Sequence, residues 1–303
     1  MRKMINRKNK IKQGMSDDLF NTILLVIVTI IFFIVLYPII YVLSSSFSSG
    51  TAVSGGQVLL WPVDFSVVGY KLVFKNKMIW TGYLNSFIYV ILGTLLHLVM
   101  TICLAYPLSR KNYQGKPFVV KYMTVSMLFG GGLIPTYILI SNLGLVDTRT
   151  WMIINGAVGI SHAIMMRTFF QSNVPNELLE SAKMDGISDI GFLLKITLPL
   201  SKAVISVICL YAIVGRWNNF FSPMLYLRDR NKYPLQLVVN EILNSANMDV
   251  SQIQDPALLE QMASAVDAMK YSLIVVSTVP MLVLYPFVQK FFEKGVTIGS
   301  VKG

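Results

Sequence analysis

Long apolar stretches alternate along the chain with short segments that hold most of its charged residues. The first apolar stretch, at about residues 19–43, contains no charge and ends at the polar sequence SSSFSSG. Because a helix needs about 20 apolar residues to cross the hydrocarbon core of a bilayer, this stretch predicts a membrane span. A signal peptide is the alternative, but the stretch is too long and no A-x-A-like cleavage site follows it. Comparable stretches predict five further spans, at about residues 82–107, 118–141, 151–170, 203–223 and 271–292.

Composition supports a membrane protein. Of the 303 residues, 54% are apolar and 14% are charged, whereas soluble domains have roughly 45–50% apolar and about 25% charged residues. The net charge of +11 could indicate a nucleic-acid partner, but the basic residues flank the predicted spans, which favours membrane lipid instead. Cys103 and Cys209 each lie inside an apolar stretch, so we expect small buried side chains and no disulfide.

The distribution of positive charge predicts the orientation of the spans. Cytoplasmic loops of membrane proteins carry an excess of Lys and Arg. Most of the 26 Lys and Arg residues fall on one side if both termini are cytoplasmic. We therefore expect an all-α integral membrane protein with six transmembrane helices, N-in and C-in. Its parts would be a basic N-terminus (1–18), a single membrane domain (19–292) with an inner loop at 172–200 and an outer loop at 224–270, and a cytoplasmic tail (293–303).

The inner loop contains the charged stretch ESAKMDGISDIGFLLKITLP, which predicts a helix, a turn and a second helix. Its first helix is amphipathic, with Met184 as the only apolar residue on the charged side. Gly186 fits the position after a helix end, where positive φ favours glycine. Ser188 would cap a helix at 189–198, and Pro199 would end it. Such a segment forms a rigid handle on the cytoplasmic face; a surface loop lying in lipid headgroups is the alternative.

The same stretch resembles the EAA loop of ABC-importer permeases, which reads E-A-A, three residues, Gly, nine residues, then I-x-L-P. Ser181 replaces the first Ala of that pattern, a small-for-small change. The resemblance implies that the loop docks into a groove on a separate ATPase subunit. The residues that it assigns to ATPase coupling are Glu180, Ser181, Ala182, Met184, Asp185, Gly186, Ile196, Leu198 and Pro199.

Three further stretches resemble the maltose-transporter-type carbohydrate permeases. RWNNFFSPMLYL and YPFVQKFFEKGVTIGSVKG are similar to that family's motifs, and LFGGGLIPTYILI resembles a branch that imports oligosaccharides from complex polysaccharides. The resemblance implies a multi-pass subunit of the cell membrane, with a second permease, two ATPase subunits and an extracellular solute-binding protein as partners. The chain has no G-x-x-x-x-G-K-[ST] motif, so the ATPase partners would bind ATP and Mg²⁺, and no cofactor or metal site is expected in this chain.

Candidate substrate contacts are polar and aromatic residues within the spans. One such cluster, Arg216 to Phe220, lies in span five. It begins about 14 residues after Lys202, which is roughly 21 Å along a helix and places it in the outer half of the bilayer. Its Arg216 would either line the pathway or snorkel outward, with Trp217 in the interfacial aromatic belt. Glycines 130–132 and Pro135 predict a broken helix. The pathway candidates are Arg216, Trp217, Asn218, Asn219, Phe220, Tyr137, Asn142 and Asn155.

Several functional alternatives stay open at this point. His97 would form an interhelical hydrogen bond or relay protons. The C-terminal residues Gly299, Ser300, Val301, Lys302 and Gly303 would insert near the ATPase interface, as the resemblance implies, or form a frayed tail. The outer loop would form a short helical cap and either dock the solute-binding protein or simply be exposed. Another cargo such as a peptide, and a proton-coupled transporter, are the alternative functions; an enzyme is disfavoured because no H-E-x-x-H motif or deep carboxylate is present.

Overall fold

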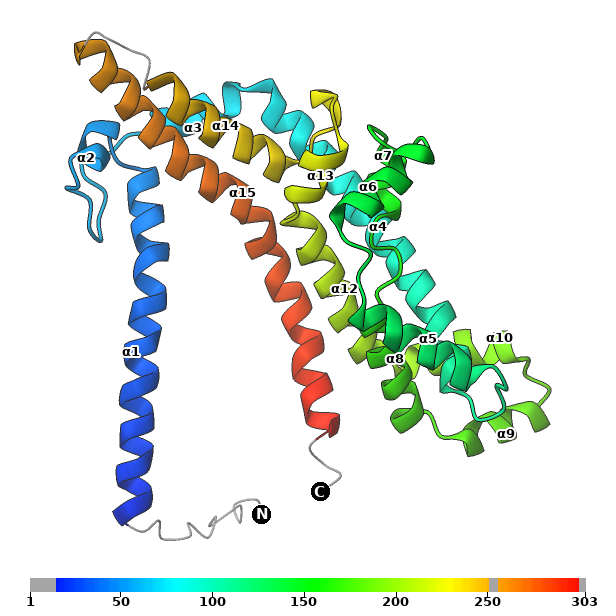
Figure 1. Cartoon of the computed structure of the whole chain (residues 1–303). Coiled ribbons are helices and arrows are strands. Elements are labelled where there is room, and N and C mark those ends of the chain that lie inside the picture. Colours follow the sequence, from blue (N-terminus) through cyan, green and yellow to red (C-terminus); the bar gives the residue numbers. More distant parts are fainter. Residues whose placement is uncertain (1–14, 251–255, 300–303) are drawn as a thin grey trace. The chain divides into compact units, whose positions relative to one another are not determined.

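The computed structural model describes residues 15–250 and 256–299, and side chains over residues 17–244 and 264–286. Within these ranges the chain is helical and contains no strand (Figure 1). In chain order the elements are α1 (Met15–Ser46), α2 (Gly50–Ser54), α3 (Val68–Lys75), α4 (Lys77–Ser109), α5 (Lys116–Leu128), α6 (Leu133–Asn142), α7 (Arg149–Ile154), α8 (Ile160–Asn173), α9 (Asn176–Met184), α10 (Asp189–Phe192), the π-helix η1 (Leu193–Thr197), α11 (Leu198–Leu200), α12 (Lys202–Trp217), α13 (Phe221–Tyr226), the 3₁₀-helix η2 (Arg230–Lys232), α14 (Leu235–Val250) and α15 (Pro256–Gly299).

The chain divides into two compact units. The first comprises residues 1–71 and 253–275, and the second comprises residues 72–252 and 276–303. In the first unit, the polar end of α1 is tied down by serine hydroxyls. Ser44 Oγ donates to the Leu60 carbonyl (2.6 Å), and Ser272 Oγ donates to the Ser46 carbonyl (3.2 Å). Because these hydroxyls satisfy backbone groups, the SSSFSSG segment packs closely although it is polar.

Helix α4 forms the centre of the second unit. A cluster of buried side chains joins α4 to α8 and α12. Its members are Ala105, Met166, Phe170, Val204 and Ile208. A second cluster joins α4 to the short helices α6, α7 and α13 through Tyr89, Ile140, Met152, Tyr226 and Leu227. The three helices α4, α8 and α12 therefore form the frame on which the functional residues of this unit lie.

Three helices of the described chain are long and apolar enough to cross a membrane, within residues 17–46, 77–109 and 264–286. Two bent helix pairs, α5 with α6 and α10–α11 with α12, raise this number to at most five if each pair is one span. The structure therefore supports a protein with membrane-spanning helices. Six crossings with both termini cytoplasmic remain a prediction.

The predicted third and fourth spans are both interrupted. Helices α5 and α6 meet at an angle of 114°, and Gly132 between them has φ +77°, which confirms the predicted break. The fourth span was expected as one helix over 151–170, but α7 ends at Ile154 and α8 begins at Ile160. Gly156 between them has φ +71°, a conformation that side chains other than glycine rarely adopt and that ends a helix.

The end of the fifth predicted span also differs from the structure. The fifth span was expected to reach residue 223, but α12 ends at Trp217 and Pro223 lies in α13. The outer loop, 224–270, was expected to form a short helical cap, and it contains all of α14 and the start of α15. Of the predicted C-terminal tail, residues 293–299 continue α15, whereas Ser300, Val301, Lys302 and Gly303 lie outside the described residues.

Candidate functional site

The charged inner loop folds as a helix, a tight turn and a second helical segment. Helix α9 ends in a Schellman motif, in which the Gly186 N–H donates to the Lys183 carbonyl (3.0 Å) and the Ile187 N–H donates to the Ala182 carbonyl (2.9 Å). Gly186 has φ +76°, as predicted for the residue after the helix end. The turn therefore has a single defined conformation, fixed by local backbone hydrogen bonds.

The second helical segment runs from Asp189 to Leu200. Its start is capped as predicted, because Ser188 Oγ accepts a hydrogen bond from the Gly191 N–H (3.1 Å). The segment widens into the π-helix η1, in which the Leu198 N–H donates to the Leu193 carbonyl. Pro199 was expected to end the segment, but it lies in the first turn of α11, where its missing N–H costs little. The chain then bends by 81° at Ser201 into α12.

Apolar packing fixes this loop to the end of α4. Phe192 is fully buried in a cluster with Val174 and Ala182, and Ile196 packs against it. Tyr106 OH of α4 donates to the Asp189 carbonyl (3.0 Å). Burying a phenylalanine contributes roughly 1.5–3 kcal/mol. The loop is therefore bound to the helical frame and is not a free surface loop.

Arg110, which follows α4, strengthens this attachment. Its guanidinium lies 5.1 Å from the ring centroid of Tyr106 and 5.8 Å from that of Phe192. Burial lowers the pKa of Arg110, although an arginine stays charged at any physiological pH. Arg110 also lines a cavity of about 340 Å³ beside α9, together with Lys111, Glu180 and other residues.

The outer face of the loop is exposed and mixed in character. Met184 at the end of α9 is 89% exposed, and Glu180 is exposed as well. Lys183 and Asp189 form an ion pair (3.1 Å) across the turn, but both side chains are more than half exposed, so its contribution is small. The exposed side of the turn therefore carries one large apolar side chain together with charged ones.

The predicted coupling residues fall into a buried and an exposed set. Ala182 is buried, and Ile196 and Leu198 are half-buried, so these three hold the loop together. The exposed members are Glu180, Ser181, Met184, Asp185, Gly186 and Pro199. One face of the loop is thus exposed, while its other face packs on the frame.

A second cavity, of about 350 Å³, lies among α4, α7, α8 and α12. Of the predicted pathway residues, Asn155, Arg216 and Asn219 line it. Asn155 Nδ2 donates to Ser222 Oγ (2.7 Å), and Asn219 Oδ1 accepts from the Ser222 N–H (3.1 Å). The cavity size is within the range of about 300–1,000 Å³ that is common for small-molecule sites.

A pair of histidines forms one wall of this cavity. His97 of α4 and His162 of α8 share a hydrogen bond between His97 Nε2 and His162 Nδ1 (2.9 Å), which matches the predicted interhelical bond. His97 Nδ1 also bonds the Gly156 carbonyl (2.9 Å), which can only accept. With both rings neutral, His162 Nδ1 is therefore the donor and His162 Nε2 remains an acceptor. Tyr211 stacks on His162, with ring centroids 5.7 Å apart.

The remaining predicted pathway residues do not line this cavity. Trp217 is buried, and its Nε1 donates to the Ser277 carbonyl (3.1 Å). Tyr137 packs on Tyr226. Asn218, Phe220 and Asn142 are exposed elsewhere. Sequence reasoning did not single out His162 or Tyr211 as cavity residues; the polar positions in the fourth apolar stretch were the available signal for His162.

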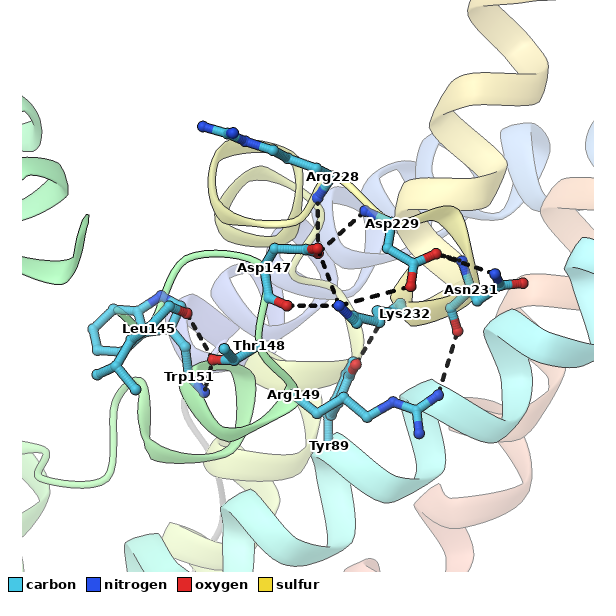
Figure 2. Close-up of polar contacts among 10 residues, drawn as sticks. All are labelled: Tyr89, Leu145, Asp147, Thr148, Arg149, Trp151, Arg228, Asp229, Asn231 and Lys232. Atoms are coloured by element: carbon cyan, nitrogen blue, oxygen red, sulfur yellow. Dashed lines mark hydrogen bonds and ion pairs between the residues drawn. The ribbon is translucent and has the colours of Figure 1, made fainter. Parts of the chain in front are cut away.

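A polar cluster joins the loop between α6 and α7 to the segment between α13 and α14 (Figure 2). Asp147 accepts hydrogen bonds from the backbone N–H groups of Arg228 and Asp229 (both 3.1 Å) and pairs with Lys232 Nζ (3.0 Å). Partial burial alone would raise the pKa of Asp147, but these donors outweigh that effect and hold the pKa below its usual value. Arg149 adds a bond from Nη2 to the Asn231 carbonyl (3.4 Å). The loop before α7 is thereby fixed to the segment before α14.

Comparison with known proteins identifies the family. No family model matches the chain. The permease YtcP of a polygalacturonan/rhamnogalacturonan transport system in Bacillus subtilis is 34% identical over 292 residues, covering 95% of this chain and all of that protein. The chain belongs to the carbohydrate ABC-transporter permeases. Protein LplC of Bacillus subtilis is 38% identical over 275 residues, covering 89% of this chain and 90% of that protein.

A solved structure supports the same family and fold. A chain of a bacterial ABC transporter involved in the import of the acidic polysaccharide alginate superimposes with a TM-score of 0.83 at 32% identity, covering 92% of this chain and 99% of the other. This carbohydrate ABC-transporter permease is thus an integral membrane protein that acts as a transporter subunit and not as an enzyme. The ABC-transporter permease fold predicted from the motifs is confirmed.

Proposed function

We propose that this permease forms half of the translocation pathway of an ATP-driven, binding-protein-dependent importer for an oligosaccharide in the cell membrane. A second permease would form the other half. Two ATPase subunits would bind ATP and Mg²⁺, and an extracellular solute-binding protein would deliver the cargo. The coupling loop, residues 172–200, would transmit the movement of the ATPase. The observation that carries this proposal is the stiff, anchored loop with an exposed apolar tip, in a chain whose relatives are ABC permeases.

The geometry of the coupling loop supports transmission of movement. One face of α9 is fixed to α4 through Ala182 and Phe192, while Met184 and Glu180 are exposed for a partner. The helical segment 189–200 is joined to α12 by Ser201 alone. Because neither side of that junction is a flexible loop, a displacement of α9 and α10 is passed directly to α12, which carries Arg216 at the cavity.

The cargo class is supported by the relatives and by the cavity. Relatives are named as permeases for polygalacturonan/rhamnogalacturonan, arabinooligosaccharides and galactooligosaccharides. Saccharides offer many hydroxyl groups and flat apolar faces. The cavity supplies hydrogen-bonding side chains, such as Asn155 and His162, and the Tyr211 ring. These groups fit an oligosaccharide whose successive sugar units form hydrogen bonds with the cavity side chains as the chain passes through.

The proposed coupling is tested at the exposed tip of α9. Met184→Glu introduces a charge where an apolar contact with the ATPase is expected, and Met184→Leu preserves the apolar character. When the permease pair is purified in detergent, we expect Met184→Glu to lose most of the co-purifying ATPase and of the cargo-stimulated ATP hydrolysis. Met184→Leu should retain both. Full ATPase retention and full transport by Met184→Glu would exclude the exposed tip as the docking surface.

Side-specific labelling tests the predicted topology. A cysteine introduced at Met184, after replacement of Cys103 and Cys209, should react with a membrane-impermeant thiol reagent only when the cytoplasmic side is opened. The 89% exposure of Met184 ensures that the site is accessible in the free chain. Labelling from the outside of intact cells would refute the N-in, C-in orientation and, with it, the coupling role of the loop.

A further inference from the structure

Arg216 is held in an unusual position for a cation. It lies in the last turn of α12, and its side chain lines the 350 Å³ cavity. A Cβ atom added at Gly93 of α4 would lie 2.5 Å from Arg216 Nη1 and 2.6 Å from Cζ. The guanidinium therefore rests against α4 at a place that only glycine leaves open. It does not snorkel away from the frame, because α4 covers it on that side.

The positive charge of Arg216 is not neutralised within the described chain. No carboxylate among the described side chains forms an ion pair with Arg216, and the described cavity lining contains no Asp or Glu. Its hydrogen bond is a long one, from Nη1 to the Met152 carbonyl (3.4 Å). The ends of α7 and α12 supply only partial negative charge, about half an elementary charge each. A charge within a membrane-spanning segment is costly unless it is paired or has a function.

We propose that the cargo is an acidic oligosaccharide and that Arg216 binds its carboxylate in this cavity. The inference rests on the proposed import function and adds the chemical class of the cargo. A guanidinium presents two parallel N–H donors that match the two oxygens of a carboxylate, and this recognition is geometrically selective. A neutral sugar offers no group that would balance the charge. Uronic acids supply that group once per sugar unit.

The neighbouring cavity residues suit the rest of a uronic acid unit. In the neutral form of His162, its Nε2 can accept from a sugar hydroxyl, and so can the side-chain oxygen of Asn155. Tyr211 is 54% exposed and presents its ring beside His162. One cation beside several neutral hydrogen-bonding groups distinguishes a carboxylate-bearing saccharide from both a neutral saccharide and a free anion such as phosphate.

The test compares two probes on the complete importer in detergent without its solute-binding protein. One probe is a set of short oligogalacturonates, and the other is the same set with each carboxylate reduced to an alcohol. Binding is followed as the rise in thermal stability with probe concentration. We expect the wild-type complex to bind the acidic probe more tightly, and Arg216→Gln to weaken that binding about ten- to a hundredfold while leaving the neutral probe unaffected.

Three further variants separate recognition from structure. Arg216→Lys keeps the charge without the paired donors and should retain part of the preference for the acidic probe. Gly93→Ala keeps the arginine but displaces its guanidinium, so the preference should fall although the charge remains. Arg228→Gln removes an exposed arginine outside the cavity and should change nothing.

The possible outcomes distinguish this inference from the proposed function. The role of Arg216 would be overturned if the wild type bound both probes equally or bound neither. It would also be overturned if the preference for the acidic probe survived in Arg216→Gln, or if that variant lost the binding of both probes equally. If the reconstituted importer with its binding protein still takes up neutral oligosaccharides, the proposed function stands without the inference. If it takes up no saccharide and its ATP hydrolysis is not stimulated, the proposed function itself is wrong.

Discussion

Replacing Gly186 in the coupling loop tests whether transport depends on a rigid turn. Gly186 has φ +76°, and a Cβ atom added there would meet no atom within 4 Å. Gly186→Val therefore creates no clash with the rest of the protein. The cost of this substitution is local, because the left-handed conformation is about 1–2 kcal/mol less favourable for a residue with a side chain. A β-branched residue lies at the upper end of that range.

This cost is comparable to the stability of the turn itself. The turn is closed by the hydrogen bonds from the N–H groups of Gly186 and Ile187, and each contributes about 0.5–1.5 kcal/mol net. A strain of about 1.4 kcal/mol changes an equilibrium constant tenfold. We therefore expect the turn to open about tenfold more often in Gly186→Val, which loosens the angle between α9 and α10 while the frame of α4, α8 and α12 stays folded.

The assay is cargo-stimulated ATP hydrolysis by the reconstituted importer, together with membrane insertion and the amount of co-purified ATPase. Gly186→Val should insert normally but lose nearly all stimulation. Gly186→Asn should recover part of it, because asparagine tolerates positive φ better than valine does. Gly144→Val is the matched control, since Gly144 has φ +66° and equally open surroundings but lies between α6 and α7. This control should keep its ATPase subunits.

Two results would refute the reasoning about the turn. Undiminished transport by Gly186→Val would show that coupling does not need the closed turn. Loss of the ATPase subunits in Gly144→Val to the same extent as in Gly186→Val would show that the effect is general destabilisation.

Two more predictions concern the polar cluster and the C-terminal end. The donors around Asp147 hold its pKa in the folded protein below the usual value of 3.8. The stability that they add to the folded state is therefore fully present above about pH 3.8 and is lost as the pH falls through the lower pKa of the folded protein. Asp147→Asn should therefore destabilise the fold at pH 7 by about 1 kcal/mol, after allowing for partial exposure, and this should appear as a lower melting temperature. The difference in melting temperature from wild type should shrink below about pH 4. An unchanged difference at low pH would assign the loss to packing. Removal of the residues after Glu293 should weaken stimulated ATP hydrolysis if the tail contacts the ATPase interface, and a truncated protein with full stimulation would show that the tail has no coupling role.

The local structure of the coupling loop was predictable because its determinants lie close together in the sequence. Gly186 supplies positive φ and Ser188 caps the next segment, and the structure confirms both. The broken third span was predictable for the same reason, since glycines 130–132 interrupt it. The predicted end at Pro199 is wrong, because Pro199 lies within α11 and the segment continues to Leu200. The π-helix η1 was not predicted, because π-helices are rare and occur mostly as single turns within α-helices.

The amino-acid sequence by itself determined the family, the apolar stretches and the helix–turn–helix of the coupling loop, because motif spacing and backbone preference act within about twenty residues. Only the tertiary structure decided which polar residues meet. Arg216 and Trp217 are neighbours in sequence, yet one lines the cavity and the other is buried with its Nε1 bonded to Ser277. Membrane helices are apolar on most of their surface, so periodicity does not show which face meets another helix. The packing of α4, α8 and α12 makes that choice.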